Sequence, residues 1–329
     1  MSEIPERLFR ALADGQFRSG VKLAADFGVT RSAIWKSVAK LRQLGAEIHA
    51  VPNRGYRLRH AAAPLDAARI DAHLPATSKQ RLDSLETQWQ LESTSATLLA
   101  RPAPLPGQFA VMLAENQTGG RGRRGRSWLA PLGGSICYSI ACALPQLPRD
   151  ASALSLAIGV ATLRALRVHG ARELGLKWPN DVVAQGGKLA GVLIELRGES
   201  AGPVQLVVGV GINVRLADTT LREVRGGGTE PIDLAAIGAS TLDRNTIVAT
   251  MIAEHIACID VFIETGFRPF LDEWRAADVL CDRAVTVHDG GEPWNGLARG
   301  IDESGALRVA RGGRCVLVTV GDVSIRVGP

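Results

Sequence analysis

Four arginines stand among glycines in the segment Gly119-Gly120-Arg121-Gly122-Arg123-Arg124-Gly125-Arg126-Ser127-Trp128, called the arginine loop below. The spacing matches GxGxxG. It also matches the phosphate-binding P-loop, except that Arg126 stands where the P-loop has lysine. Both motifs need a helix directly after them, whereas residues 127–144 read as loop and then strand. We therefore interpret the segment as a glycine-hinged loop that closes over a polyanion such as a triphosphate. A mobile surface loop or a second nucleic-acid contact is the alternative.

A second group of polar residues surrounds a predicted β-hairpin. The sequence Lys177-Trp178-Pro179-Asn180-Asp181 is followed by Lys188-Leu189-Ala190-Gly191 and, on the same strand, Glu195. Lys188 then lies at the inner end of a mostly buried strand, where a cation needs an anion. That anion is either a carboxylate of the chain such as Asp181 or a substrate carboxylate with the phosphate attached to it. The small residues before Val192 indicate that backbone or ligand approaches closely there.

Two glycines interrupt the apolar run Val208-Gly209-Val210-Gly211-Ile212-Asn213-Val214. They favour the close approach of a flat ligand ring over ordinary sheet packing, and Asn213 is then expected to face phosphate or a metal. Upstream, Glu92-Ser93-Thr94-Ser95 supplies clustered hydroxyls, although such residues are also common helix caps. Gln117 can both donate and accept hydrogen bonds, as a cyclic urea or amide requires.

These residues must be positioned by a mixed α+β body. Apolar runs with alternation or helical spacing predict its elements. The predicted strands are Val111–Glu115, Ser135–Leu144, Leu174–Trp178, Lys188–Arg197 and Val204–Val214, and the predicted helices are Leu65–Leu74, Ala96–Ala100, Ala151–Val168 and Thr246–Glu264. A small β-barrel is predicted at the end of the chain from Ala284–His288, Trp294–Ile301, Leu307–Ala310, Cys315–Val320 and Ser324–Val327.

The charge of the chain is concentrated at its beginning. Of a net +5, residues 1–60 carry 11 Lys and Arg against 5 Asp and Glu, and the remainder carries 27 against 28. Helical spacing predicts Ile4–Leu12, Val21–Phe27 and a third helix capped by Thr30, and Pro52-Asn53-Arg54-Gly55 predicts the turn of a basic wing.

This pattern indicates a winged helix-turn-helix that binds DNA, and the alternative is a solvated three-helix domain whose basic face touches nothing. The residues expected to contact DNA are Arg31, Ser32, Trp35, Lys36, Lys40, Asn53 and Arg54.

Several classes of protein are disfavoured. The apolar runs fall short of the ~18–20 residues that a bilayer span needs, and the N-terminus lacks a secretory core, so we expect a cytoplasmic protein without a membrane partner. The five cysteines form neither CxxC pairs nor Cys/His clusters, so we expect small buried hydrophobes rather than disulfides or structural metal. The sequence contains no HExxH motif.

Taken together, the ordered motifs resemble those of the biotin protein ligases, and the winged helix resembles that of the bifunctional class, which also represses the biotin operon. The resemblance implies a winged helix-turn-helix DNA-binding domain at 1–62, a central mixed-sheet biotin/lipoate ligase-like catalytic domain at 63–278, and a C-terminal SH3-like β-barrel at 279–329.

The resemblance also implies an activity and partners. Biotin and MgATP would give biotinyl-5′-adenylate, which then biotinylates a lysine of biotin carboxyl carrier protein. A homodimer formed on adenylate binding would bind operator DNA. The alternative is a ligand-sensing transcription factor whose ligase-like body binds its effector without catalysing transfer.

The residues that the resemblance assigns to the site fall into overlapping sets. Lys188 and Arg123 are the expected catalytic residues, and Mg²⁺ is expected with ATP, its protein ligands being left unassigned. The family usually has Asn where this chain has Ser95, and the bulky Trp35 argues against carrying over an operator sequence. Biotin is assigned to Ser93, Thr94, Ser95, Gln117, Arg121, Gly122, Arg123 and Lys188, and ATP or the adenylate to Arg121, Arg123, Arg124, Arg126, Trp128, Lys177, Asn180, Lys188 and Asn213.

Overall fold

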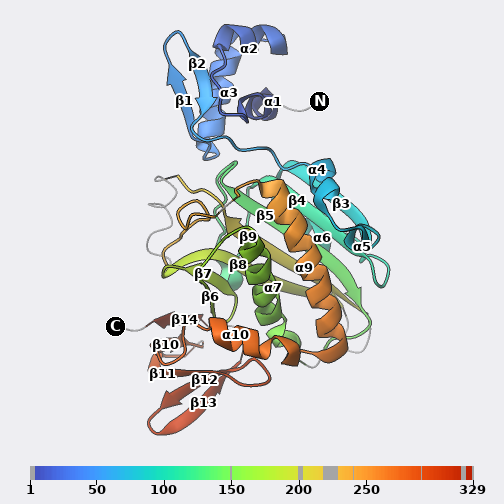
Figure 1. The fold of residues 1–329 in the computed structure, drawn as a ribbon, viewed down its shortest axis with the longest axis vertical. Helices are drawn as coiled ribbons and strands as arrows, with labels where there is room; N and C mark the ends of the chain where they lie inside the picture. The colour runs from blue at the N-terminus through green and yellow to red at the C-terminus, as the bar shows by residue number, and fades with distance from the viewer. Residues whose placement is uncertain are drawn as a thin grey trace.

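The computed structural model of the chain describes residues 4–148, 150–198, 203–217, 229–239, 241–289, 291–319 and 324–327. Three units follow one another along its long axis (Figure 1). They are an N-terminal helical head, a central sheet with covering helices, and a small C-terminal sheet.

The head is a winged helix-turn-helix, as predicted. Helices α1 (Ile4–Leu12), α2 (Gly20–Phe27) and α3 (Arg31–Gln43) precede the antiparallel hairpin of β1 (Ile48–Val51) and β2 (Gly55–Leu58). Thr30 caps α3 by accepting a hydrogen bond from the amide of Ala33 at 3.2 Å. Val21 does not join the buried face of α2, because its side chain is 63% exposed.

The central unit is built on a seven-stranded sheet in the order β3-β4-β5-β9-β8-β7-β6. Only the pairing of β3 with β4 is parallel among these described strands. Strands β3 and β7 were not predicted from the sequence. The strands are β3 (Leu82–Leu91), β4 (Phe109–Gln117), β5 (Ser135–Leu144), β6 (Leu174–Lys177), β7 (Asp181–Ala184), β8 (Gly187–Gly198) and β9 (Val204–Asn213).

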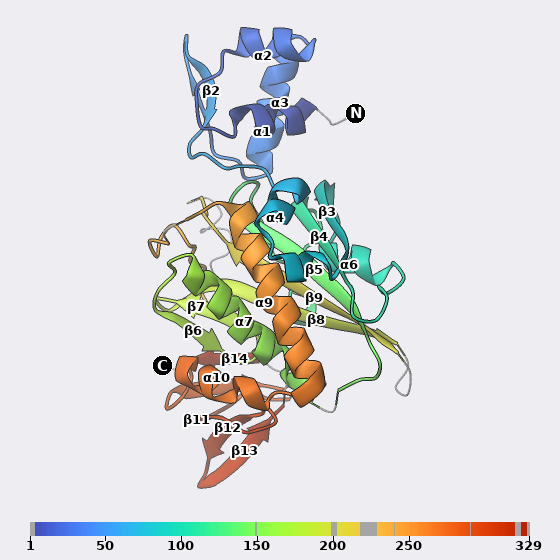
Figure 2. The ribbon, with the colours of Figure 1, turned by 45° about the vertical axis from the view of Figure 1, so that its right-hand side comes forward.

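Helices cover the two faces of this sheet unequally. The long helices α7 (Leu154–Val168) and α9 (Arg244–Thr265) lie side by side over one face (Figure 2). The short α6 (Thr94–Leu99) packs on the other, where Leu98 joins Met112 and Val207 in a separate apolar cluster. The remaining elements before the last sheet are α4 (Ala67–His73), α5 (Ala76–Lys79), α10 (Leu271–Ala277) and the 3-10 helices η1 (Arg123–Gly125), η2 (Ala151–Ala153) and η3 (Arg268–Phe270).

Residues 151–168 and α9 correct one sequence expectation, since both are long and apolar enough to cross a membrane. The most apolar windows of these two segments are 72% and 56% buried inside the protein. We therefore interpret them as core helices, which meet the same criteria of length and composition.

The C-terminal unit is a five-stranded antiparallel sheet in the order β13-β12-β11-β10-β14. The indole of Trp178, which is buried in the central unit, donates to the carbonyl of Gly305 at 3.0 Å and ties the two sheets together. The expected strand end at Val320 lies outside the described residues. The strands are β10 (Ala284–His288), β11 (Trp294–Ile301), β12 (Leu307–Arg311), β13 (Arg314–Val318) and β14 (Ser324–Val327).

The linker between head and central sheet is held by a buried ion pair. Arg244, at the start of α9, pairs with Glu115 of β4 at 2.9 Å, and their side chains are 2% and 3% exposed. The same guanidinium donates to the carbonyl of Ala63 at 2.8 Å. Asn245 adds a bond to the carbonyl of Pro64 at 3.0 Å. The linker is therefore fixed to the start of α9 and, through the ion pair, to β4.

All five cysteines are free thiols. Cys137, Cys142 and Cys258 are buried, as expected, but Cys281 and Cys315 are exposed, so the prediction of buried hydrophobes is wrong for these two.

Candidate functional site

The face of the sheet that carries α6 also carries a group of hydroxyls. Thr94 and Ser95 open α6, and their oxygens lie 2.7 and 2.9 Å from the hydroxyl of Ser139 on β5. Gln117 closes the group, because its Oε1 accepts from the amide of Thr94 at 2.7 Å and from the Thr94 hydroxyl at 3.1 Å. Since Oε1 of Gln117 already accepts two hydrogen bonds from Thr94, the amide nitrogen, which lies beside the Cys137 thiol, is the group of this side chain that can donate to a ligand.

Ser93 has a local role. Its hydroxyl accepts from the amide of Ala96 at 3.4 Å and caps α6, as the helix-cap alternative proposed. Ser139, in contrast, was missed by the sequence analysis. It is fully buried in a strand, and nothing in its local sequence distinguishes it from a packing residue.

The two glycines of β9 make room for side chains of this same face. A Cβ on Gly209 would lie 2.5 Å from the hydroxyl oxygen of Ser95, and one on Gly211 would lie 2.3 Å from the indole of Trp128. The predicted close approach is present. The flat ring that approaches in the structure, however, is the chain's own Trp128.

The two glycines of β9 and Gly191 of β8 are together called the glycine floor below. Lys188 lies at the edge of this floor. Its ammonium pairs with Asp181 at 2.7 Å and lies 5.5 Å from the centre of the Trp128 ring. A Cβ on Gly191 would meet that ammonium at 3.1 Å and the indole at 3.3 Å. The salt bridge that the sequence left as one alternative is thus formed. The pair is 28% and 18% exposed, so an incoming anion can reach it.

The arginine loop folds as a short hairpin over the site. The amide of Gly122 donates to the carbonyl of Arg126 at 2.6 Å, and that of Trp128 to Gly120 at 2.9 Å. Arg124 adopts the left-handed conformation with φ 60°. The loop is therefore ordered around a strained turn rather than around a helix N-terminus.

The loop arginines point to different partners. Arg121 reaches Glu195 at 3.7 Å, Arg123 donates to the side-chain oxygen of Asn180 at 3.4 Å, and Arg124 donates to the carbonyl of His288 in β10 at 3.4 Å. Glu195, for which the sequence predicted no individual role, is thus a contact of the loop. The long contact of Arg121 and its 48% exposed side chain leave its guanidinium able to turn toward an anion.

Three other predicted residues hold the framework around the site. Asn180 donates to the carbonyl of Val192 at 2.8 Å, and Lys177 donates to the hydroxyl of Thr229 at 2.5 Å. The buried amide of Asn213 donates to the carbonyls of Lys188 and Ile232 at 3.2 and 3.0 Å. These bonds account for both amide hydrogens of Asn213, and its expected contact with phosphate stays a prediction.

The Cys137 thiol beside the site is not poised for covalent chemistry. Burial raises the pKa of the Cys137 thiol, beside Gln117 and Trp128, to about 12, so it is not a nucleophile at neutral pH. In the described part of the chain, no group of three His, Cys, Asp or Glu side chains is arranged to hold a metal ion.

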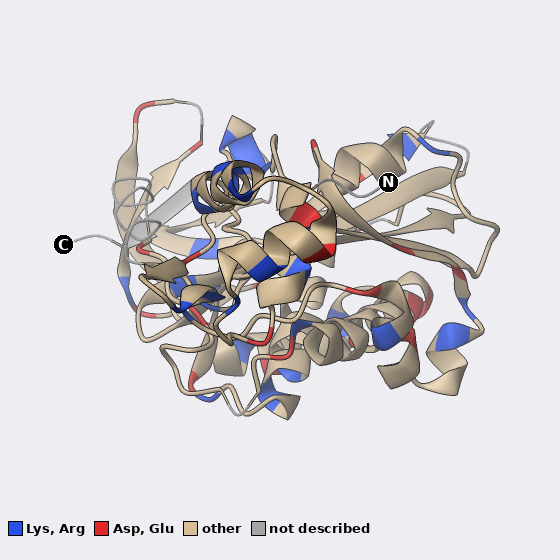
Figure 3. Cartoon of the chain, turned by 90° about the horizontal axis from the view of Figure 1, so that it is seen from above, with Lys and Arg blue, Asp and Glu red and all other residues tan. Residues whose placement is uncertain are grey.

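The head carries its predicted DNA-contacting residues on a free surface, and Figure 3 marks the charged residues as seen from above. Trp35 is 63% exposed, and Arg54 on the wing stacks over Phe17 at 4.1 Å. Asn53 adopts φ 60° at the wing turn. Arg31, Ser32, Trp35, Lys36, Lys40, Asn53 and Arg54 are all exposed.

Comparisons with known proteins first define a class. Residues 88–213 match the biotin/lipoate A/B protein ligase family, residues 7–57 an HTH domain, and residues 280–326 the biotin protein ligase C-terminal domain. A biotin protein ligase from Aquifex aeolicus in complex with biotin superposes with a TM-score of 0.62 at 25% identity, covering 75% of this chain and 99% of that one.

Curated relatives narrow the class to one family. The bifunctional ligase/repressor BirA of Escherichia coli is 36% identical over 98% of this chain and 97% of its own. The biotin--[acetyl-CoA-carboxylase] ligase of Mycobacterium tuberculosis is 40% identical over 79% of this chain and 95% of its own. The chain belongs to the biotin protein ligase family, in its bifunctional form with an N-terminal HTH domain, and it is a ligase enzyme.

Proposed function

We propose that the chain activates biotin with ATP to biotinyl-5′-adenylate and transfers the biotinyl group to one lysine of biotin carboxyl carrier protein. The observation that carries this proposal is the arrangement of Lys188 and the arginine loop around a glycine floor, beside a pocket of hydroxyls and one amide. Such a site fits an acid whose far end is a polar ring and whose carboxylate must meet a triphosphate.

The first step joins two anions that repel each other. The biotin carboxylate attacks the α-phosphorus, an acyl–phosphate bond forms, and pyrophosphate leaves. Lys188 would turn from Asp181 to the carboxylate and α-phosphate, and Arg121 and Arg123 would bind the phosphates, so that fixed cations offset the repulsion. Mg²⁺ would arrive on the triphosphate and neutralise part of its charge, which suits a site without a carboxylate cluster among its described residues.

The polar ring of biotin is assigned to the hydroxyl pocket. The amide nitrogen of Gln117 can donate to the ureido carbonyl, and the oxygens of Thr94 and Ser95 can accept from the ring N–H groups. Ser95 supplies a single hydroxyl where the family usually has Asn, and that hydroxyl is hydrogen-bonded to the hydroxyl of Ser139. The residues proposed for biotin are Ser93, Thr94, Ser95, Gln117, Arg121, Gly122, Arg123 and Lys188.

The remaining assignments concern the nucleotide and the second step. Closure of the loop would shield the mixed anhydride from water until the carrier amine attacks its carbonyl carbon, releasing AMP and a proton. Arg123→Gly is therefore expected to release adenylate and label bystander lysines. The residues proposed for ATP or the adenylate are Arg121, Arg123, Arg124, Arg126, Trp128, Lys177, Asn180, Lys188 and Asn213.

We further propose that the head represses transcription by binding operator DNA as a ligand-linked homodimer. The exposed basic α3 and wing support this, since a helix and a wing of this kind enter adjacent grooves. The five free thiols are compatible with a cytoplasmic location. The proposed domain boundaries are 1–62, 63–278 and 279–329.

One experiment tests the ligase and distinguishes the alternatives. Purified chain, MgATP, labelled biotin and a carrier domain should release pyrophosphate and label the carrier. A chain that binds biotin without releasing pyrophosphate would be a ligand-sensing transcription factor instead. Binding of the head to DNA should weaken steeply with salt, because phosphate contacts release counterions, and a flat salt response would contradict the DNA assignment.

A further inference from the structure

The segment that follows the arginine loop enters the core of the DNA-binding head. Leu132 is 4% exposed and belongs to the head's apolar cluster, together with Phe9 of α1 and Leu41 of α3. Its amide donates to the carbonyl of Leu44, the C-cap of α3, at 2.9 Å. A residue of the central unit is therefore part of the support for the recognition helix.

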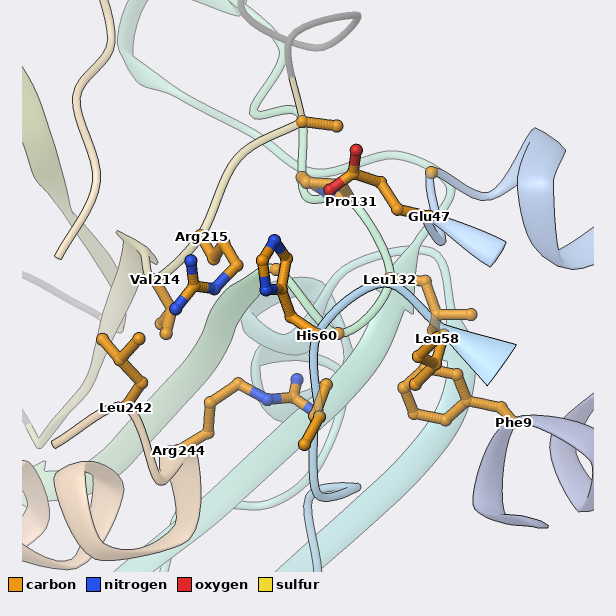
Figure 4. Close-up of a pocket in the computed structure, with 16 residues that line it drawn as sticks. Phe9, Glu47, Leu58, His60, Pro131, Leu132, Val214, Arg215, Leu242 and Arg244 are labelled. Carbon is orange, nitrogen blue, oxygen red and sulfur yellow. The ribbon is translucent and has the colours of Figure 1, made fainter. Parts of the chain in front are cut away.

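The backbone on either side of Leu132 fits the head closely. A Cβ on Gly45 would lie 2.7 Å from Pro131, and one on Gly133 would lie 3.0 Å from the ring of Phe9. Both glycines have positive φ, 90° and 75°, which other residues rarely adopt. Figure 4 shows Leu132 beside Phe9 and Leu58 of the head, and Pro131 near Glu47. Residues 131–134, called the junction segment below, thus dock into a shaped groove.

The other end of this stretch lies in the ligase site. The indole of Trp128 rests on Gly211 and Gly191 beside Lys188. The backbone amide of Trp128 donates a hydrogen bond to the carbonyl of Gly120. Only three residues separate Trp128 from Leu132, so the two Cα atoms can be at most about 14 Å apart. Leu129, within this connection, is 46% exposed, so its side chain adds little packing that could hold the connection in place. A displacement of the Trp128 backbone that exceeds the slack of so short a connection must move the junction segment.

We propose that residues 128–132 transmit occupancy of the ligase site to the orientation of α3, as a short tether within a single chain. A ligand ring that takes the place of the Trp128 indole, or stacks on it, moves one end of the tether, and the other end moves Leu44 at the C-cap of α3. The linker at Ala63 and Pro64 is held separately by Arg244 and Asn245, so the head has a second fixed point about which it can turn. The proposal rests on the ligase and DNA-binding functions proposed above.

The test lengthens the tether without removing either anchor. Gly-Ser-Gly-Ser is inserted between Leu129 and Ala130, and the matched control carries the same insertion between Gly312 and Gly313, in the turn that joins β12 to β13. The DNA probe is a duplex selected from a random pool for tight binding in the presence of biotin and ATP. Carrier biotinylation and the affinity for this duplex, with and without biotin and ATP, are measured on both chains and on the unaltered protein.

The tether predicts a selective loss. The lengthened chain should biotinylate the carrier within about threefold of the control, while its ligand-linked change in DNA affinity is at least about tenfold smaller than in the control, the remainder being due to ligand-linked dimerisation. An undiminished ligand-linked change in the lengthened chain would overturn the proposal. If the unaltered protein shows no biotinylation or no ligand-linked change, the proposed function fails instead, and the two failures are distinguishable.

Hydrogen exchange provides a second test, which remains valid if the insertion reduces ligase activity. In the unaltered chain, biotin and ATP should change the exchange of the Leu44 and Leu132 regions at a protein concentration too low for dimers. Leu129→Gly with Ala130→Gly, which softens the tether at its natural length, should reduce that change. Persistence of the full change in this variant, or its appearance only in dimers, would contradict a route within one chain.

Discussion

Strand β9 presents two different surfaces of one sheet. On the face beneath α7 and α9, Val208, Val210 and Ile212 are almost fully buried in the main core. On the other face Gly209 and Gly211 alternate with them and leave space for a hydroxyl and an indole. Successive side chains of a strand point to opposite faces of the sheet. A single strand therefore supplies apolar side chains to the core on one face and glycines that leave space for the site on the other.

The ion pairs on the two faces differ in the same way. The side chains of Arg244 and Glu115 are shielded from water, and the guanidinium also donates hydrogen bonds to the backbone, so the pair is held in place by several contacts. Lys188 and Asp181 are partly exposed and joined by one contact. The first pair stabilises the fold as long as both partners remain, and the second can exchange its partner for a substrate anion.

The largest expected effect concerns the buried pair. Arg244→Ala should lower the free energy of unfolding by about 3–5 kcal/mol, because it leaves the Glu115 carboxylate buried and unpaired. Urea unfolding measures this loss. The double change Arg244→Met with Glu115→Leu should recover most of it. A loss below about 1 kcal/mol for Arg244→Ala would show that the two pairs do not differ as described.

On the open face, Lys188→Ala should slow pyrophosphate release by about 10²–10³-fold with little change in stability, since it removes a charge that acts on the reacting groups. Lys79→Ala is the matched control, because Lys79 pairs with Asp71 at 3.0 Å on the surface. Equal rates for the two variants in a single-turnover assay would contradict the proposed function of Lys188.

Neighbouring positions of β9 allow a direct test of the two faces. Val210→Ala should cost about 2 kcal/mol of stability through lost core packing while the ligase persists. Gly211→Ala should reduce ligation, because its Cβ would lie 2.3 Å from the Trp128 indole, with a smaller effect on unfolding. Trp128 fluorescence should respond to the second change far more than to the first. A larger effect of Val210→Ala than of Gly211→Ala on ligation would contradict the assignment of the two faces.

A smaller, pH-dependent effect belongs to the helix-covered face. Burial lowers the pKa of His255 in α9 from 6.5 to about 3, and its ring lies between Tyr138 and Thr162. The unfolded chain binds a proton below about pH 6.5 that the folded ring does not bind until about pH 3. Stability is therefore complete above pH 6.5 and falls by up to about 1.4 kcal/mol per pH unit between these values. His255→Gln should make the urea midpoint less dependent on pH in that window, and an unaltered dependence would refute this origin.

Much of the framework could be predicted from local sequence. β5, β10, β11 and β14 have the predicted bounds, because alternating apolar residues between turns define strands without reference to partners. The parallel β3 and the four-residue β7 were missed, since their side chains show no clear alternation of burial. Their pairing with neighbouring strands is a non-local property.

The residues of the candidate site can be divided in the same way, into those with a local signal in the sequence and those without one. Lys188, Gln117 and the arginine loop were found because a cation, an amide and glycines stand out against an apolar background. Ser139 was not found, because a serine in a strand has no distinguishing local signal. Its significance arises from two hydroxyls that are more than forty positions away in the chain.

The sequence by itself determined the separation into a basic head and a near-neutral body, the helix and strand periods, and the open positions that glycine leaves. The tertiary structure alone decided what fills those positions: the Trp128 indole on Gly211, Glu115 against an arginine 129 residues away, and Leu132 in the core of the head. The reason is physical. Spacing fixes the face on which a residue lies, whereas its partner depends on how distant segments pack together.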